Sequence, residues 1–463
     1  MQGIKLRDGS RIAIIGGGPA GALFAHFVIK YTSMNSLNPE ITIFDGKDFL
    51  MSGPKGCNLC AGIISDSLRQ KFEKEGIFLP EGRIVNRLDG YIIHGDEDTL
   101  ELSCADNVSD KISAVFRGNG PRFSAFPEVV SFDDFLLAMA QDAGGRVVSQ
   151  PVQDIQLPSD RGEPVTLIFG KEDALQKCEA DLVVGAFGVN SFFQRKIQKL
   201  DFGFRPPSTL SIYQGEIMLG QEEVLRKFGN FIHVFMRKSK NLRFASLVPK
   251  GDYISLTLIG KKNATPELFD EFMDLKDIQG LIPRTKPQCF CYPKIVTGFS
   301  KKPYADRLLL IGDAAFSRHY KNGIESAFLT AKLAAETAVF AGIDASSIAA
   351  DYMQKAERLI RNDNFYGKLL FRINHFTSSV PILARSHFIL AANCSERESP
   401  KKMRFVLWNM LTGNVPYKRV FKASLSCKLQ LELLCTILKL TLQRMKKKAQ
   451  KFKQRLSFKR KSS

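Results

Sequence analysis

A run of glycines near the start of the chain has the spacing of a nucleotide-binding turn. Gly16, Gly18 and Gly21 form the pattern Gly-x-Gly-x-x-Gly directly after the apolar segment 11–15. Such glycines permit a tight turn, close approach of the backbone to a pyrophosphate, and close packing of helix on strand. The helix that begins around Ala20 presents unpaired N–H groups and a positive dipole end to the phosphates. The pattern predicts a dinucleotide site; the alternative is a glycine-rich turn without nucleotide.

A carboxylate completes this predicted site. Asp45 ends a second apolar segment, residues 41–45, where an acid can accept hydrogen bonds from ribose hydroxyls. The separation between Gly16 and Asp45 exceeds the usual spacing of about 20 residues, which predicts an insertion around residues 31–39.

A second glycine–carboxylate pair follows another apolar segment, residues 307–311. Gly312 and Asp313 end that segment, so the carboxylate would lie beside a ligand's sugar. A further helix opens immediately afterwards, and its N-terminus can face an anionic group. The residues that open it are Asn322, Gly323 and Ile324.

Together these motifs resemble the flavoprotein family that contains aromatic-ring hydroxylases and geranylgeranyl reductases. The resemblance covers roughly residues 10–345 and extends to a middle motif at residues 181–191. It implies bound FAD, with Asp313 on the ribityl chain and the next helix directed at the flavin N1–C2=O edge. The family usually has Asp-Gly where this chain has Phe187-Gly188, which disfavours a hydroxylase.

The closer resemblance is to the geranylgeranyl reductases. Residues 244–252 resemble their Tyr-x-Trp-x-Phe-Pro-Lys signature, with Phe244 and Ser246 at the aromatic positions. The resemblance implies reduction of a carbon–carbon double bond in an isoprenoid or lipid-like substrate. Halogenases of this family carry a two-tryptophan motif, whereas Trp408 is the only tryptophan here. Two alternatives remain: an FAD-dependent monooxygenase of an aromatic or quinone precursor, and a non-catalytic membrane-associated protein with this fold.

The electron donor leaves no motif of its own. No second complete Gly-x-Gly-x-x-Gly is visible, so NAD(P)H or another donor would bind transiently.

Three basic residues follow the second motif, where the family usually has a proline. Arg318, His319 and Lys321 could lie near the isoalloxazine and raise its reduction potential by stabilising reduced-flavin charge. We take them as candidate catalytic residues. The alternative is that they face solvent or pair with Glu325.

Four cysteines form two close pairs that the fold could bring together: Cys57 with Cys60, and Cys289 with Cys291. Geranylgeranyl reductases carry a cysteine near the flavin in the first region, so Cys60 is a further catalytic candidate. The four thiols could hold zinc or an iron–sulfur cluster, form a redox disulfide, or pack as inert small hydrophobes. We assign no metal site.

These elements predict an α/β fold: a Rossmann-like FAD-binding domain interrupted by an antiparallel β-sheet substrate domain, with a helical C-terminal region. The predicted FAD-binding segments are residues 1–80, 126–200 and 299–345; the substrate-domain segments are 81–125 and 201–298; a helical region spans 346–418; and an amphipathic helix with a basic tail spans 419–463.

The composition is that of an ordinary globular protein. Of 463 residues, 44% are hydrophobic and 24% charged, which excludes a disordered body. The chain has no apolar run of eighteen residues and no signal-peptide pattern at its start, so we expect a cytoplasmic protein.

The net charge of +19 is concentrated late in the chain, where residues 444–463 hold ten Lys or Arg and no acid. In residues 425–440, Lys428, Glu432 and Lys439 share one side of a helix whose remaining circumference is rich in leucine. We expect peripheral attachment to the inner face of an anionic membrane. The alternative is that this helix docks on the protein's own core. We expect no specific nucleic-acid binding, because no recognition fold is present.

Overall fold

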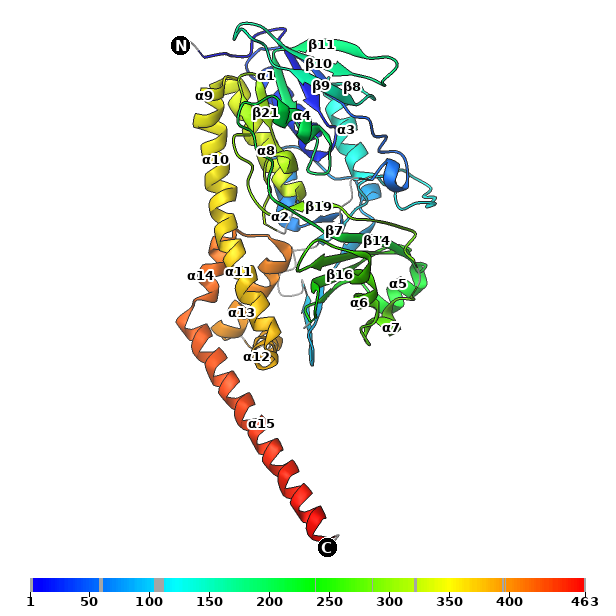
Figure 1. The fold of residues 1–463 in the computed structure, drawn as a ribbon, viewed down its shortest axis with the longest axis vertical. Helices are drawn as coiled ribbons and strands as arrows, with labels where there is room; N and C mark the ends of the chain where they lie inside the picture. The colour runs from blue at the N-terminus through cyan, green and yellow to red at the C-terminus, as the bar shows by residue number, and fades with distance from the viewer. Residues whose placement is uncertain are drawn as a thin grey trace.

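The computed structural model describes residues 3–57, 61–103, 112–237, 239–284, 286–319, 323–393, 395 and 397–461, with side chains up to residue 450. The largest sheets have six and seven strands, and a group of helices forms the C-terminal part of the chain (Figure 1). The α/β fold with a helical C-terminal region, predicted from the sequence, is confirmed.

The Rossmann-like sheet has six strands in the order β20-β21-β12-β1-β2-β8. All neighbours are parallel except β20 and β21. Its central strands are runs of branched apolar residues, as expected where both faces of a parallel sheet are covered. The strands are β1 (Arg11–Ile15), β2 (Glu40–Phe44), β8 (Arg146–Val148), β12 (Leu182–Gly185), β20 (Tyr304–Ala305) and β21 (Leu308–Leu310).

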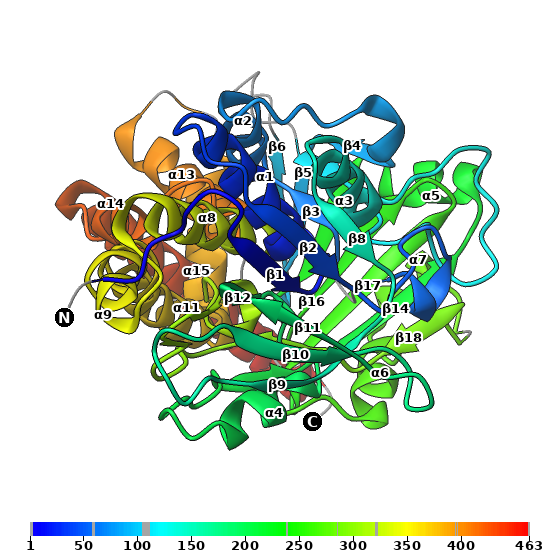
Figure 2. The same cartoon turned by 90° about the horizontal axis from the view of Figure 1, so that it is seen from above.

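Helices and a small sheet cover the two faces of this sheet. Figure 2 shows α1 and α3 on one face and the three strands β9, β10 and β11 on the other. Helix α1 packs extensively on α8, which joins the two glycine motifs. The bounds are α1 (Pro19–Ser33), α3 (Phe132–Asp142), α8 (Gly323–Glu336), β9 (Val152–Gln156), β10 (Val165–Phe169) and β11 (Gln176–Ala180).

The second sheet has seven strands in the order β18-β14-β17-β16-β15-β5-β6. It is antiparallel as predicted, apart from one parallel pair between β15 and β5. Strands β5 and β6 come from a chain segment more than 100 residues before β15. The bounds are β5 (Gly90–His94), β6 (Thr99–Ser103), β14 (Tyr213–Met218), β15 (Phe231–Phe235), β16 (Leu242–Lys250), β17 (Tyr253–Gly260) and β18 (Cys289–Cys291).

Short elements connect the sheets and cover the outer face of the second one. The helices among them are α2 (Asp66–Lys74), α4 (Phe193–Lys199), α5 (Gln221–Phe228), α6 (Pro266–Met273) and α7 (Ile278–Leu281). The strands are β3 (Ile63–Ile64), β4 (Asn86–Leu88), β7 (Ile112–Ala114), β13 (Thr209–Ser211) and β19 (Lys294–Val296).

The C-terminal helices lie against both domains. A nearly continuous helix runs through α9 (Ala345–Ile348) and α10 (Gln354–Ala356) into α11 (Asn362–Ser379), joined by π-helical turns. Helices α12 (Pro381–Ala392), α13 (Glu398–Thr412) and α14 (Tyr417–Ser424) pack beside it. The last helix, α15 (Cys427–Lys461), projects beyond the body (Figure 1). Within the described ranges, no helix combines the length and apolar character needed to cross a bilayer.

One buried tyrosine connects the C-terminal helices to the segment between β21 and α8. The Tyr417 ring is fully buried, and its hydroxyl donates a hydrogen bond to the carbonyl oxygen of His319 at 2.7 Å. We expect Tyr417→Phe to lower the free energy of unfolding by about 1–2 kcal/mol, because a buried acceptor loses its donor. Urea denaturation measures the change. Tyr366→Phe, on α11, is the matched control, and an equal loss in both variants would contradict the assignment.

Candidate functional site

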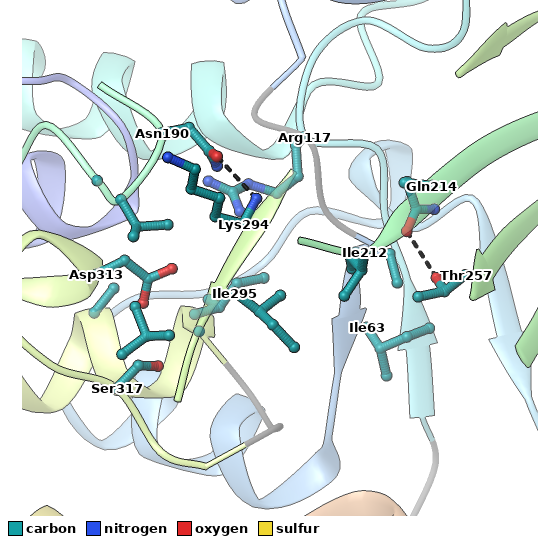
Figure 3. Close-up of a pocket in the computed structure, with 18 of the residues that line it drawn as sticks. Ile63, Arg117, Asn190, Ile212, Gln214, Thr257, Lys294, Ile295, Asp313 and Ser317 are labelled. Carbon is teal, nitrogen blue, oxygen red and sulfur yellow. Dashed lines mark hydrogen bonds between the residues drawn. The ribbon is translucent and has the colours of Figure 1, made fainter. Parts of the chain in front are cut away.

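A cavity of about 720 Å³ lies where the two sheets and the C-terminal helices meet. In Figure 3, Asp313 and Ser317 lie on one side of it and Gln214 and Thr257 on the other. Its volume is in the range of small-molecule and cofactor sites. Residues beside the six-stranded sheet that line the cavity are Gly16, Gly18, Ala20, Asp45, Asp313, Gly323 and Ile324. The seven-stranded sheet supplies Phe244, Ser246 and Val248, and the C-terminal helices supply Phe371 and Met410.

The glycine turn between β1 and α1 leaves no room for side chains. Gly16 has a φ of +107°, and a Cβ there would lie 2.6 Å from the carbonyl oxygen of Ala186. A Cβ on Gly21 would lie 1.8 Å from the carbonyl oxygen of Gly16. Gly18 is the N-cap of α1 and, like Gly16, lines the cavity. The backbone therefore approaches the cavity closely at the N-terminus of α1, as an anionic ligand group requires.

Asp45 organises this turn as well as lining the cavity. One carboxylate oxygen accepts a hydrogen bond from the Gly17 N–H at 2.7 Å, and the other accepts one from the Lys47 N–H at 2.8 Å. Burial raises the pKa of Asp45, while these two backbone bonds oppose the rise. Each carboxylate oxygen keeps a second lone pair, so a ligand hydroxyl could still bond there.

Asp313 carries the clearest sign of a ligand-binding position. Its buried Oδ1 atom has no hydrogen-bond partner among the residues that the structure describes. Burial also raises the pKa of this carboxyl. Because buried polar atoms in native proteins almost always have partners, an unsatisfied oxygen that faces a cavity marks a position for a ligand donor.

The two glycine motifs meet at Ala20 and Gly312. Gly312 has a φ of +58°, and a Cβ there would lie 2.9 Å from the Cβ of Ala20. The Gly312 N–H donates to Thr330 Oγ1 at 3.0 Å, which holds α8 against this turn. Gly323 begins α8 at the cavity, so two helix N-termini face the same space. The predicted Asn322 lies outside the described residues.

Arg318 forms part of a buried ion-pair network. Its guanidinium lies 2.8 Å from Glu325 and 3.3 Å from Asp363, and it also donates to the carbonyl oxygens of Gly413 and Val415. This arrangement agrees with the alternative in which Arg318 pairs with Glu325. Two carboxylates balance its charge, so Arg318 joins α8 to the C-terminal helices and has little net charge to offer a ligand.

The surroundings of His319 lower its pKa. Burial, together with the nearby cations of Lys368 and Arg243, lowers the pKa of His319 to about 4. At neutral pH the imidazole therefore carries no positive charge that could stabilise reduced flavin. The third basic residue of the prediction, Lys321, lies outside the described residues.

Three of the four predicted cysteines lie near one another. Burial raises the pKa of Cys291 to about 12, with the neighbouring thiols of Cys57 and Cys289 and the carboxyl of Glu216 adding to the rise. A protonated thiol is a poor nucleophile and a poor metal ligand. Among the described residues, no group of three or more His, Cys, Asp or Glu could hold a metal ion. Cys60 lies outside the described residues.

The residues of the predicted substrate signature alternate along β16. Phe244, Ser246 and Val248 line the cavity, whereas Ala245 and Leu247 are buried in the core on the opposite face of the sheet. This period of two is the expected pattern for a strand with a different environment on each face.

Several polar lining residues escaped the sequence prediction. Arg117 forms an ion pair with Asp133 and lies close enough to Asp313 to lower the pKa of that carboxyl partly. Thr257 Oγ1 donates to Gln214 Oε1 at 2.7 Å across two strands of the second sheet (Figure 3). Arg117 stands in no motif, and the Gln214–Thr257 pair depends on strand register, so neither had a local signal.

Comparison with known proteins places this architecture. No family model matches the chain. A curated geranylgeranyl diphosphate reductase from Synechocystis is 23% identical over 347 residues, which cover 71% of this chain and 75% of that protein. A geranylgeranyl bacteriochlorophyll reductase-like protein from Thermoplasma acidophilum superimposes with a TM-score of 0.58 at 18% identity, over 90% of this chain and 96% of its own.

Two other solved structures broaden the comparison. A flavoprotein/dehydrogenase from Cytophaga hutchinsonii gives a TM-score of 0.59 at 16% identity, with 89% of this chain and 98% of that one covered. A flavin-dependent brominase gives 0.58 at 16% identity, with 94% and 99% covered. The chain has the fold of these reductase-like and flavin-dependent proteins. The predicted resemblance is thereby confirmed at the level of fold, and its neighbours include both reductases and halogenases.

The Arg318 network gives a stability prediction. Arg318→Met removes the cation from buried Glu325 and Asp363, so we expect the free energy of unfolding to fall by about 3–5 kcal/mol. Arg361→Met removes an exposed ion pair with Glu357 and should cost less than about 1 kcal/mol. Urea denaturation compares the two variants, and losses of similar size would contradict a structural role for Arg318.

The same network predicts an acid dependence. Burial opposes ionisation of Glu325, but Arg318 and Lys71 outweigh it and hold the pKa of Glu325 below its ordinary value. A carboxyl whose folded pKa is depressed stabilises the protein above its unfolded pKa, and this contribution is lost as pH falls through the folded pKa. Wild-type protein should therefore lose stability below about pH 4.5, and Arg318→Met should lose less. Urea midpoints between pH 7 and pH 3 test this, and parallel curves would contradict it.

Proposed function

We propose that this protein is an FAD-dependent oxidoreductase that reduces a carbon–carbon double bond in an isoprenoid or lipid-like substrate. The observation that carries the cofactor assignment is the unsatisfied Oδ1 of Asp313, which faces a cavity walled by two helix N-termini. Gly16 and Gly18 would hold the pyrophosphate, Asp45 a ribose, and Asp313 the ribityl chain. Bound there, FAD would supply hydride-transfer chemistry.

The chain's own residues would then position and shield the reactants. The substrate part of the cavity is bounded by Phe244 and Val248 of β16, Ile232 and Val234 of β15, and Phe371 of α11. These apolar walls suit a hydrocarbon chain and exclude water from the reacting atoms. The Gln214–Thr257 pair offers one polar contact in that wall.

The similar proteins support an oxidoreductase but do not separate a reductase from a monooxygenase. The curated relative is named a geranylgeranyl diphosphate reductase, and one structural neighbour is described as geranylgeranyl bacteriochlorophyll reductase-like. The brominase and the other halogenases among the neighbours keep an oxygen-using monooxygenase as the second candidate. In either case NAD(P)H or another donor would supply the electrons by transient binding.

Cofactor binding is tested by changing Asp313. We expect wild-type protein to purify with non-covalent FAD, and Asp313→Ala to bind FAD about 10- to 100-fold more weakly, because one or two charge-assisted hydrogen bonds are lost. Gly18→Val should prevent binding by placing a side chain at the pyrophosphate. Asp142→Ala, at the exposed end of α3, is the control. Full FAD content in both site variants would contradict the assignment.

The reaction class is tested by anaerobic reduction. The flavin of a reductase of this kind should be reduced by its donor in the absence of substrate. In many aromatic monooxygenases, NADPH reduces the flavin rapidly only after the substrate has bound. We expect the flavin bands to bleach with NADPH or dithionite alone, and to recover when an oxidant with a conjugated isoprenoid double bond is added. Reduction by NADPH only in the presence of an aromatic compound would favour the monooxygenase.

A further inference from the structure

Helix α15 has one face that the body of the protein already covers. Leu429 and Leu433 are buried in the core cluster that includes Met403 and Trp408 of α13. Farther along, Arg444 lies 3.3 Å from Glu97, at the outer edge of the second sheet. The alternative prediction, in which this helix docks on the protein's own core, therefore holds for this face. Attachment of the helix to a membrane stays a prediction.

The opposite face of α15 is apolar and exposed. The exposed fractions of Leu431 and Met445 are both 62%, and Leu438 and Leu442 are more than half exposed. Cys435 is exposed between them. These residues alternate at spacings of four and three, and Ala449 continues the series. The set, called the α15 seam, is Leu431, Cys435, Leu438, Leu442, Met445 and Ala449.

This spacing is a heptad repeat. Residues that recur every 3.5 positions form the a and d seam of a coiled coil, which keeps facing a partner helix when the two helices supercoil. Between Thr441 and Gln450, every large apolar residue belongs to the seam. The apolar stripe is therefore narrow there. A helix that lies in a bilayer interface instead buries a broad apolar face.

From residue 439 onward, most positions that flank the seam are basic. By sequence, the e and g positions of residues 439–450 hold Lys439, Thr441, Lys446 and Lys448. Two copies of this helix would place like charges opposite one another in either orientation, which destabilises pairing. Acidic side chains at the same positions of another helix would instead be attracted. Charge thus argues against a second copy and for an acidic partner.

We propose that the α15 seam binds an amphipathic helix of another protein, one whose own apolar heptad seam is flanked by Glu or Asp. Figure 1 shows α15 extending away from the body, so a partner helix can lie along the seam without meeting the rest of the molecule. Docking of Leu429 and Leu433 on the body fixes the helix in place beforehand, which lowers the ordering cost of binding. This proposal is independent of the proposed reaction.

The test uses a synthetic probe and the full-length protein. The probe is a labelled four-heptad peptide with leucine at a and d and glutamate at e and g, and its control is a scrambled peptide of the same composition. Fluorescence anisotropy gives the affinities in 0.15 M salt. We expect the heptad peptide to bind at least about tenfold more tightly than the scrambled one, because only the former matches the seam.

Matched variants separate the seam from general charge. Leu438→Ser with Leu442→Ser should weaken binding of the heptad peptide about tenfold or more, whereas Gln443→Ser with Gln450→Ser, off the seam, should leave it within about twofold. Unchanged urea midpoints establish that both pairs fold. Equal affinity for the two peptides would overturn the proposal.

Competing occupants give distinct results. If the seam variant abolishes flotation on vesicles of phosphatidylglycerol and phosphatidylcholine while the heptad peptide does not bind, the occupant is a membrane and the proposal is wrong. If light scattering finds a wild-type dimer that the seam variant dissociates, the occupant is a second copy. If duplex DNA binds through the basic positions and the heptad peptide does not, the occupant is nucleic acid.

Discussion

Contact between backbone atoms at the glycine turn is the constraint on which the site depends. Gly21 packs so close to Gly16 that a Cβ would lie 1.8 Å from the Gly16 carbonyl oxygen, and a Cβ on Gly312 would lie 2.9 Å from the Cβ of Ala20. These two contacts fix α1 on β1 and bring the turn after β21 beside it. As a result, two helix N-termini and two carboxylates from segments far apart in the sequence surround one end of the cavity.

The second sheet and the C-terminal helices form the other end of the cavity. Alternate residues of β16, in the second sheet, line the cavity. Ala245 and Leu247, between them, pack in the hydrophobic core on the other face of that sheet. The C-terminal helices close the cavity, and Arg318 joins them to α8 through Glu325 and Asp363. A network close to the predicted cofactor site thus serves chiefly to hold three parts of the structure together.

The sequence predicted local features well and long-range pairing poorly. The glycine motifs and their aspartates could be located because their chemistry requires short fixed spacings. The buried contacts of Arg318 could not be predicted, because Asp363 and the carbonyl groups of Gly413 and Val415 lie far from it in the sequence. Similarly, the leucines of α15 formed one broad apolar surface in sequence, and only the structure separates the face that docks from the exposed seam.

We propose that this cavity holds FAD through its adenosine and pyrophosphate groups as well as through its flavin. Equilibrium titration of flavin-free protein with FAD and with FMN tests it most directly, because FMN lacks the groups assigned to Gly18 and Asp45. We expect one FAD to bind per chain, and FMN to bind at least about tenfold more weakly. Equal affinity for the two flavins, or binding of neither, would contradict it.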